Sequence, residues 1–210
     1  AGPRLLSSSG GTVAFDLVRN WRDGLRTAPL PDLGLSDAGA RAALHAALDM
    51  VDDNALAAIS AASGSPFHSA TIITASTVFT APIEWCAVLL GRGSQVALKP
   101  SKRAPGLVPL LVASAQQAGL PLSMTAHASL DAPLVVAMGS DKTIQALSGS
   151  CTGRFLGFGH RFSAAWSNDC DEADARALAL DLALHDSRGC MSPVALFTPT
   201  PLPEAVLRIA

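Results

Sequence analysis

The chain has 210 residues, of which 49% are hydrophobic and only 15% are charged. Such a chain buries a core of its own, which excludes an intrinsically disordered protein and removes the need for a disulfide framework. The formal net charge is −2 and no basic cluster exceeds Lys99–Lys102–Arg103, so a general nucleic-acid-binding protein is excluded. No apolar stretch of about 18 residues runs without polar interruption, so no membrane span is expected. The four irregularly spaced cysteines include no CxxC pair, which predicts no metal site and suits a cytoplasmic protein.

The N-terminal third predicts an arm followed by a helix. Residues 1–35 are rich in Gly, Pro and Ser, with Trp21 as the one large anchor, and we interpret them as irregular. Residues 36–62 are predicted to be helical, with Ser36 as a suitable N-cap. The apolar residues of this segment recur on one helical face: Leu44, Leu48, Val51 and Ala55.

From residue 70 onward, strand-like and helix-like segments alternate. The predicted strands are residues 70–78, 95–98, 134–138, 154–158 and 193–198. The predicted helices are residues 82–90, 105–118, 141–147 and 171–184. The last helix is expected to bury one face, formed by Ala173, Ala177, Leu180 and Leu184. This alternation is typical of βαβ units, so the predicted fold class is α/β with a Rossmann-like parallel sheet covered on both faces.

Ligands of open α/β sheets bind beyond the carboxyl ends of the strands, which directs attention to the segments that follow them. Lys99, Ser101 and Lys102 follow the second predicted strand and offer cations and a hydroxyl to a nucleotide ribose or phosphate. A solvated loop fits the same residues. Gly139 and Ser140 follow the third strand and open a helix, whose N-terminus can bind a pyrophosphate. An ordinary strand-to-helix turn, in which a side chain only caps the helix, fits the same residues.

Two further segments carry reactive side chains. His160 follows the fourth predicted strand beside Gly159, where an imidazole can act as a general acid or base, although a structural histidine also fits. Cys190 follows Gly189 just before the last strand, where a thiolate of lowered pKa would be a strong nucleophile. A lone cysteine is also commonly an inert apolar side chain. The other cysteines and histidines show no partner pattern and are interpreted as structural.

The order of these segments resembles the aldehyde dehydrogenase superfamily. The matching segments are Val96–Ser101 (VALKPS), Gln117–Pro121 (QAGLP), Met138–Ser140 (MGS), Arg154–Ser163 (RFLGFGHRFS) and Arg188–Pro193 (RGCMSP). The last two are most similar to the fatty acyl-CoA reductases associated with bacterial luminescence. The resemblance covers about residues 70–198, and the order of the five motifs is more specific than any one of them.

The resemblance implies NADPH-dependent reduction of a fatty acyl-CoA thioester to an aldehyde, through an acyl-enzyme on Cys190. It implies that Lys99 and Ser101 hold the adenosine ribose and that Gly139 and Ser140 hold the pyrophosphate. The expected partners are therefore an acyl-CoA substrate and a nicotinamide nucleotide.

Three other residues receive roles from the resemblance. Lys102 stands where NAD-preferring members often carry Glu, so NADP is the expected cofactor and NAD the alternative. His160 is expected to assist proton transfer. Thr77 aligns with an Asn that donates to the oxyanion, and losing such a donor can cost about 2.7–4 kcal/mol unless the Thr hydroxyl replaces it. The general-base Glu of aldehyde-oxidising members has no counterpart before Gly157–Gly159, which fits reduction.

The resemblance also divides the chain. Residues 36–186 are expected to form an NAD(P)-binding Rossmann-like domain, and residues 187–210 the start of a catalytic domain. Relatives continue well beyond the cysteine, so the chain is expected to be a fragment, with homo-oligomers expected only of the full-length protein. A non-catalytic or degenerate NADP-binding module is the alternative, indicated by Thr77 and the short C-terminus. A generic α/β domain without a nucleotide role is the third hypothesis.

Overall fold

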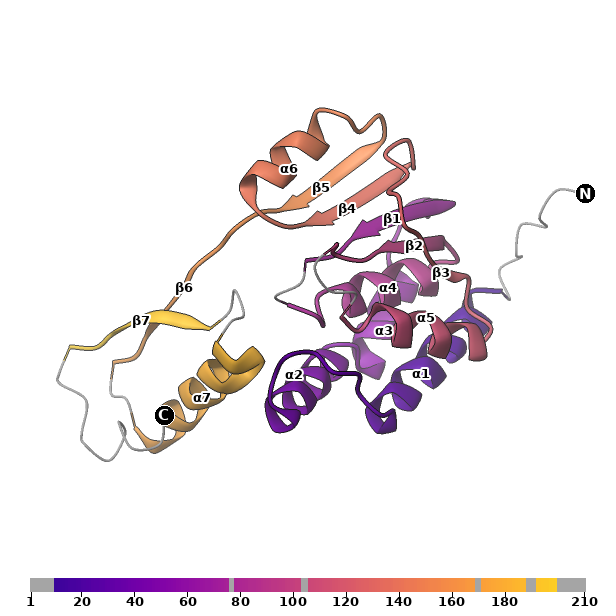
Figure 1. Cartoon of the computed structure of the whole chain (residues 1–210). Coiled ribbons are helices and arrows are strands. Elements are labelled where there is room, and N and C mark those ends of the chain that lie inside the picture. Colours follow the sequence, from indigo (N-terminus) through magenta and orange to yellow (C-terminus); the bar gives the residue numbers. More distant parts are fainter. Residues whose placement is uncertain (1–9, 76–77, 103–105, 169–170, 188–191, 200–210) are drawn as a thin grey trace, which may run out of the picture.

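A parallel sheet of five strands organises the computed structural model, which describes residues 10–75, 78–102, 106–168, 171–187 and 192–199 (Figure 1). The strands are β1 (Ser69–Ile73), β2 (Gln95–Lys99), β3 (Leu122–Met124), β4 (Leu134–Met138) and β5 (Arg154–Phe158). Their order is β3-β2-β1-β4-β5, and every neighbouring pair is parallel. The predicted α/β fold class with a Rossmann-like parallel sheet is confirmed.

Helices pack on both faces of this sheet. α4 (Pro82–Gly91) and α5 (Val108–Gln117) follow β1 and β2, and share one core with the strand residues Ile72, Leu98 and Val136. α6 (Asp141–Ser148) follows β4 and shares a second, smaller core with Val135 and Ala137. Because side chains alternate along a strand, these two cores lie on opposite faces of the sheet.

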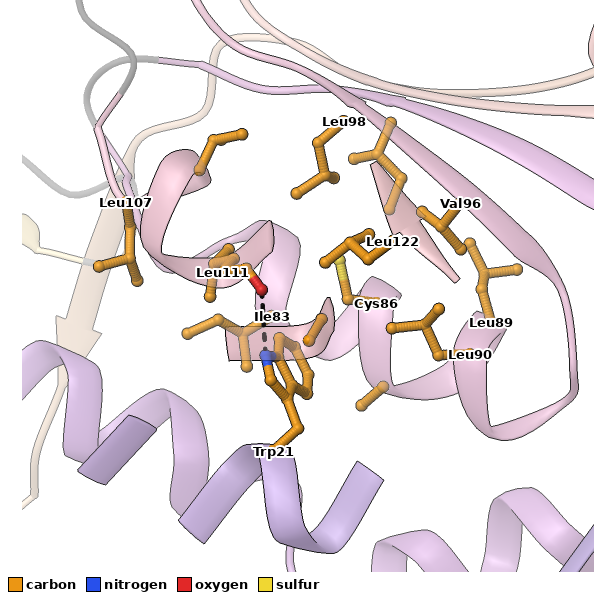
Figure 2. Close-up of a cluster of buried hydrophobic side chains, with 14 of the residues drawn as sticks. Trp21, Ile83, Cys86, Leu89, Leu90, Val96, Leu98, Leu107, Leu111 and Leu122 are labelled. Atoms are coloured by element: carbon orange, nitrogen blue, oxygen red, sulfur yellow. Dashed lines mark hydrogen bonds between the residues drawn. The ribbon is translucent and has the colours of Figure 1, made fainter. Parts of the chain in front are cut away.

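The N-terminal region is helical where the sequence predicts an irregular arm. α1 (Gly10–Thr27) buries Val18, Trp21 and Leu25, which recur at helical spacing and form one face. Trp21 reaches into the main core, and its Nε1–H donates to the carbonyl oxygen of Leu111 at 3.2 Å (Figure 2). The prediction of an irregular arm is therefore wrong for residues 10–27, because the periodicity of three large side chains outweighs the Gly, Pro and Ser content, whereas residues 28–35 lie in neither helix nor strand.

The predicted helix over residues 36–62 is interrupted. α2 (Asp37–Asp49) begins after Ser36, whose hydroxyl accepts the Gly39 N–H at 3.1 Å, so the predicted N-cap is confirmed. A second helix, α3 (Asp53–Ala61), begins after Asp52, whose carboxylate accepts the Ala55 N–H at 2.7 Å. Aspartate caps a new helix more readily than it continues an old one, which accounts for the break.

The C-terminal part of the described chain forms a separate small sheet. β6 (Ser163–Trp166) pairs in parallel with β7 (Pro193–Phe197), and α7 (Glu172–Ala183) and a 3₁₀ turn, η1 (Leu184–Ser187), lie between them in sequence. β6 belongs to the segment that the sequence assigns to the nucleotide-binding domain, yet it pairs outside the five-stranded sheet. An extended connection leads from β5 to β6 in Figure 1.

The buried apolar face predicted for α7 is wrong at three of its four positions, and the fourth, Leu184, begins η1 and packs against the main core. Ala173 and Ala177 are exposed and Leu180 is 54% exposed, whereas Ala175 on another face is buried. Periodicity predicts which side chains share a face, but burial requires another element to cover that face.

Among the described residues, no helix is long and apolar enough to cross a membrane.

Candidate functional site

The carboxyl edge of the five-stranded sheet collects most of the predicted site residues. The chain runs from β1 outward to β2 and β3, then crosses back to β4 and β5, so the strand order reverses between β1 and β4. Ligands of doubly wound sheets bind at such a switch point. The segments after β2, β4 and β5 all end at this edge, because every strand is parallel to its neighbours.

Lys99 lies on the same sheet face as α6. In the parallel register it pairs with Ile73 of β1, which belongs to the core beneath α6 and pairs in turn with Ala137 of β4. Two strand spacings separate Lys99 from Ala137, about 10 Å. The lysine is half-buried, and its carbonyl oxygen accepts the Thr74 N–H at 3.0 Å. A cation and a helix N-terminus thus flank the switch point on one face.

Ser101 and Lys102 continue from β2 beyond the same edge. Ser101 is half-buried and Lys102 is exposed, so the Lys102 ammonium is accessible to an anionic ligand. Lys99, Ser101 and Lys102 therefore all lie where a ligand at the carboxyl edge could contact them.

Gly139 and Ser140 form the turn from β4 into α6. The Gly139 N–H donates to the Phe158 carbonyl oxygen at 3.1 Å, and the Ser140 hydroxyl accepts the Thr143 N–H at 3.3 Å as the N-cap of α6. Because this hydroxyl already caps the helix, a pyrophosphate here would be bound chiefly by backbone N–H groups of the turn. A Cβ on Gly139 would come no closer than 3.5 Å to Thr143, so packing does not require glycine at this position.

Asp141, the first residue of α6, also shapes this edge of the sheet. Its Oδ1 accepts the backbone N–H of His160 at 2.7 Å, so the start of α6 is tied to the end of β5. A Cβ on Gly159 would overlap this oxygen, which explains why a glycine precedes the histidine. Met138 and Phe158, the last residues of β4 and β5, pair in the parallel register, and this pairing brings the loops after the two strands together.

His160 is exposed and lies beside the α6 turn. Three strand spacings separate β5 from β2, about 14 Å, so His160 and Lys99 lie at opposite sides of the switch point. The edge therefore brings Gly139, Ser140 and His160 together and places Lys99 across from them.

Two predicted catalytic residues, Thr77 and Cys190, lie outside the described residues. The positions that flank Cys190 are described: Ser192 is only 7% exposed, and its hydroxyl donates to the Leu184 carbonyl oxygen at 3.4 Å. Asp186 bonds to Ser36 of the α2 cap.

Two other cysteines are poor candidates for a nucleophile. Cys86 is fully buried in the main core, and this desolvation raises the pKa of its thiol far above the ordinary range. Partial burial likewise raises the pKa of the Cys151 thiol. Because the thiolate is the nucleophile, neither side chain is activated at neutral pH, in agreement with their predicted structural roles.

Comparison with solved structures identifies the fold of the chain. The chain is similar to an NAD-dependent aldehyde dehydrogenase from Sinorhizobium meliloti, with a TM-score of 0.71 and 20% identity over 99% of this chain and 48% of that one. It is similar to an acetylating aldehyde dehydrogenase from Geobacillus thermoglucosidasius, with a TM-score of 0.71 and 13% identity over 97% and 53%. A benzaldehyde dehydrogenase from Corynebacterium glutamicum matches with a TM-score of 0.70 and 15% identity, over 96% and 53%. The chain thus has the fold of aldehyde dehydrogenases and spans about half the length of these relatives.

The sequence identifies the family. A family model of acyl-CoA reductase (LuxC) matches residues 95–202, just over half of the chain. The chain therefore belongs to the acyl-CoA reductase (LuxC) family. No curated protein matches its sequence.

Proposed function

We propose that the chain carries the nucleotide-binding part, and the reactive cysteine, of an NADPH-dependent reductase that converts a fatty acyl-CoA thioester into an aldehyde. The observation that carries the proposal is the extent of the family match, because residues 95–202 include both the Lys99–Lys102 loop and Cys190. On this proposal, residues 187–210 begin the catalytic domain. The expected cytoplasmic location belongs to the same proposal, since a free reactive thiol persists in a reducing compartment.

The proposed chemistry begins at Cys190. Its thiolate sulfur bonds to the carbonyl carbon of the thioester, the carbon–sulfur bond to coenzyme A breaks, and the departing thiolate takes up a proton. The Thr77 hydroxyl is proposed to donate a hydrogen bond to the developing oxyanion. When bound, NADPH supplies the hydride that reduces the acyl group to the aldehyde. The carbon–sulfur bond to Cys190 then breaks, which releases the aldehyde and restores the thiolate, and His160 is proposed to assist proton transfer to the departing coenzyme A thiolate.

The carboxyl edge supports binding of the cofactor. Lys99 and the α6 turn lie on one face of the sheet, on either side of the switch point, as an extended dinucleotide requires. Lys99 and Ser101 are proposed to hold the adenosine ribose, and the backbone at Gly139–Ser140 the pyrophosphate. Lys102, an exposed cation, is proposed to bind the 2′-phosphate of NADP, while NAD remains the alternative.

Acyl transfer tests the proposed reaction. The chain is incubated with a long-chain acyl-CoA without NADPH, while released coenzyme A is measured by a thiol reagent and the protein by mass spectrometry. We expect one acyl group per chain on Cys190 and none on Cys190→Ala. Coenzyme A release that is equal in both proteins, or no acyl adduct on the parent chain, would overturn the reaction.

A non-catalytic NADP-binding module is the second candidate, and one sequence feature favours it. Thr77 stands where relatives of the superfamily carry an oxyanion-stabilising Asn, so turnover would be impaired before binding is lost. Calorimetry with NADPH separates the two: binding without acyl transfer supports the module, and binding with acyl transfer supports the reductase.

A further inference from the structure

Asp186 of η1 and Ser36 at the start of α2 meet although 150 positions separate them in sequence. The Asp186 carboxylate accepts two hydrogen bonds at 2.9 Å, one from the Ser36 backbone N–H and one from the Ser36 hydroxyl. The same hydroxyl oxygen accepts the Gly39 N–H at 3.1 Å. Ser36 therefore caps α2 and holds η1 with one side chain.

The contact completes a capping box with a residue from another part of the chain. In an ordinary capping box, a Glu or Gln at the third helical position accepts the N–H of the N-cap residue. That position in α2 is Gly39, which has no side chain, and Asp186 supplies the acceptor instead. Its negative charge also faces the positive end of the α2 dipole. The cap of α2 is thus complete only when η1 is docked on it.

The backbone of Asp186 shows that its conformation is held by its surroundings. Its φ is +49°, the only positive value of a non-glycine residue in the described chain. The left-handed region is unfavourable for residues with a Cβ, although Asp tolerates it better than most. A residue keeps such a conformation when the folded structure fixes it, and the paired bonds to Ser36 contribute to this here.

The chain is also anchored on the other side of Cys190. Ser192 is buried, and its hydroxyl bonds to the carbonyl oxygen of Leu184, at the start of η1. Residues 188–191 lie outside the described part, but they begin two positions after Asp186 and end next to Ser192. Both flanks of Cys190 are therefore attached to η1, and η1 is attached to α2 in the helical layer beside the main sheet.

We propose that Asp186 is a positioning residue: its two hydrogen bonds to Ser36 hold η1 on α2 and thereby fix both flanks of Cys190 relative to the five-stranded sheet. The inference rests on the proposed role of Cys190 as the reacting thiol. Asp186 acts through the chain that follows it, and contact with the reacting atoms is not required.

Alkylation of Cys190 tests the proposal without requiring turnover. The whole chain is treated with iodoacetamide between pH 6 and 9, and peptide mass spectrometry follows Cys190 separately from the other cysteines. Asp186→Asn keeps the size of the side chain and its tolerance of a left-handed backbone but removes one acceptor and the charge. Ser36→Ala removes the hydroxyl's hydrogen bond to Asp186, and its cap of the Gly39 N–H, without changing the charge, while the bond from the Ser36 backbone N–H to Asp186 remains. The matched control is Asp181→Asn, at an exposed carboxylate on α7.

We expect the alkylation rate of Cys190 at pH 7 to fall about fivefold in both contact variants, with a shifted pH profile, and to stay at the parent value in Asp181→Asn. Equal rates in all four proteins would overturn the proposal. So would a change confined to Asp186→Asn, because that would reflect the lost charge alone.

A third variant separates positioning from simple helix capping. Adding Gly39→Gln to Asp186→Asn supplies a local acceptor for the Ser36 N–H, as in an ordinary capping box. Positioning predicts that the melting temperature recovers while the alkylation rate stays low. Recovery of both would mean that Asp186 only caps α2, which would overturn the proposal. If acyl transfer fails while alkylation responds to the contact variants, the proposed reaction is wrong and the positioning role stands.

Discussion

The carboxylate of Asp141 accepts the backbone N–H of His160 at 2.7 Å, and this bond joins the loops that follow β4 and β5. The two residues are 19 positions apart, and the parallel register of β4 with β5 brings them together. The bond gives the carboxyl edge a defined shape beside the switch point, where the proposed pyrophosphate turn and the candidate proton donor lie. Gly159 is part of this arrangement because a side chain there would overlap the Asp141 carboxylate.

Gly159→Ala is expected to destabilise the chain by about 1–3 kcal/mol, since the added Cβ would displace the Asp141 carboxylate. Asp141→Ala removes that carboxylate, so the double variant should be more stable than the sum of the single effects predicts, by at least about 0.5 kcal/mol. Urea unfolding of the four proteins measures this coupling. Strictly additive effects would show that Gly159 is not constrained by Asp141.

Gly139→Ala distinguishes a binding role from a packing role. The nearest side-chain atoms to an added Cβ lie at 3.5 Å, an ordinary contact, so stability should change by no more than about 0.5 kcal/mol. If the pyrophosphate approaches this backbone, the same methyl group should weaken NADPH binding on the order of tenfold. Calorimetry measures the affinity, and Gly149→Ala at the other end of α6 is the control that should change neither property. Unchanged NADPH affinity in Gly139→Ala would remove the turn from the proposed site.

Local patterns predict much of the central sheet. The predicted strands 134–138 and 154–158 coincide with β4 and β5, because short apolar runs bounded by turn residues have few alternatives in an α/β chain. The predicted strand 70–78 ends earlier, at Ile73. The short strands β3 and β6 are missed: β3 has three residues, of which one is buried, and β6 is built mainly from small residues.

Contacts between residues that are distant in sequence could not be predicted from the local sequence pattern. Nothing near Asp186 in sequence indicates that it completes the cap of α2, and nothing near Asp141 indicates a bond to His160. The carboxyl edge itself is predictable, because parallel strands must end together: Lys99 is the last residue of β2, and Gly139 and His160 follow β4 and β5. Which of their polar groups are already engaged depends on register and helix capping, which the sequence pattern does not contain.

Lys102→Glu tests the preference for NADP. Reversing one exposed charge beside a phosphate should weaken NADPH binding on the order of tenfold to thirtyfold, and NADH binding should change little. The control is Lys142→Glu on α6, an equal charge reversal at another exposed lysine, which should leave the ratio of the two affinities unchanged. Calorimetry at fixed ionic strength gives both constants, because salt screens exposed charges. An unchanged affinity ratio in Lys102→Glu would place the 2′-phosphate elsewhere.

Acid stability depends in part on Asp53, which links α3 to α1. The Arg19 and Arg22 guanidiniums donate hydrogen bonds to its carboxylate at 3.1 and 3.0 Å, and they lower the pKa of that carboxyl below its ordinary value. A carboxyl with a depressed pKa in the folded state stabilises the protein above the unfolded-state pKa, about 3.9, and this contribution is lost as the pH falls through the folded-state value. Asp53→Asn should therefore lower the melting temperature by a constant amount between pH 5 and 7, and the difference from the parent chain should shrink below about pH 4. A difference for Asp53→Asn that persists undiminished at pH 2 would mean that charge is not its cause.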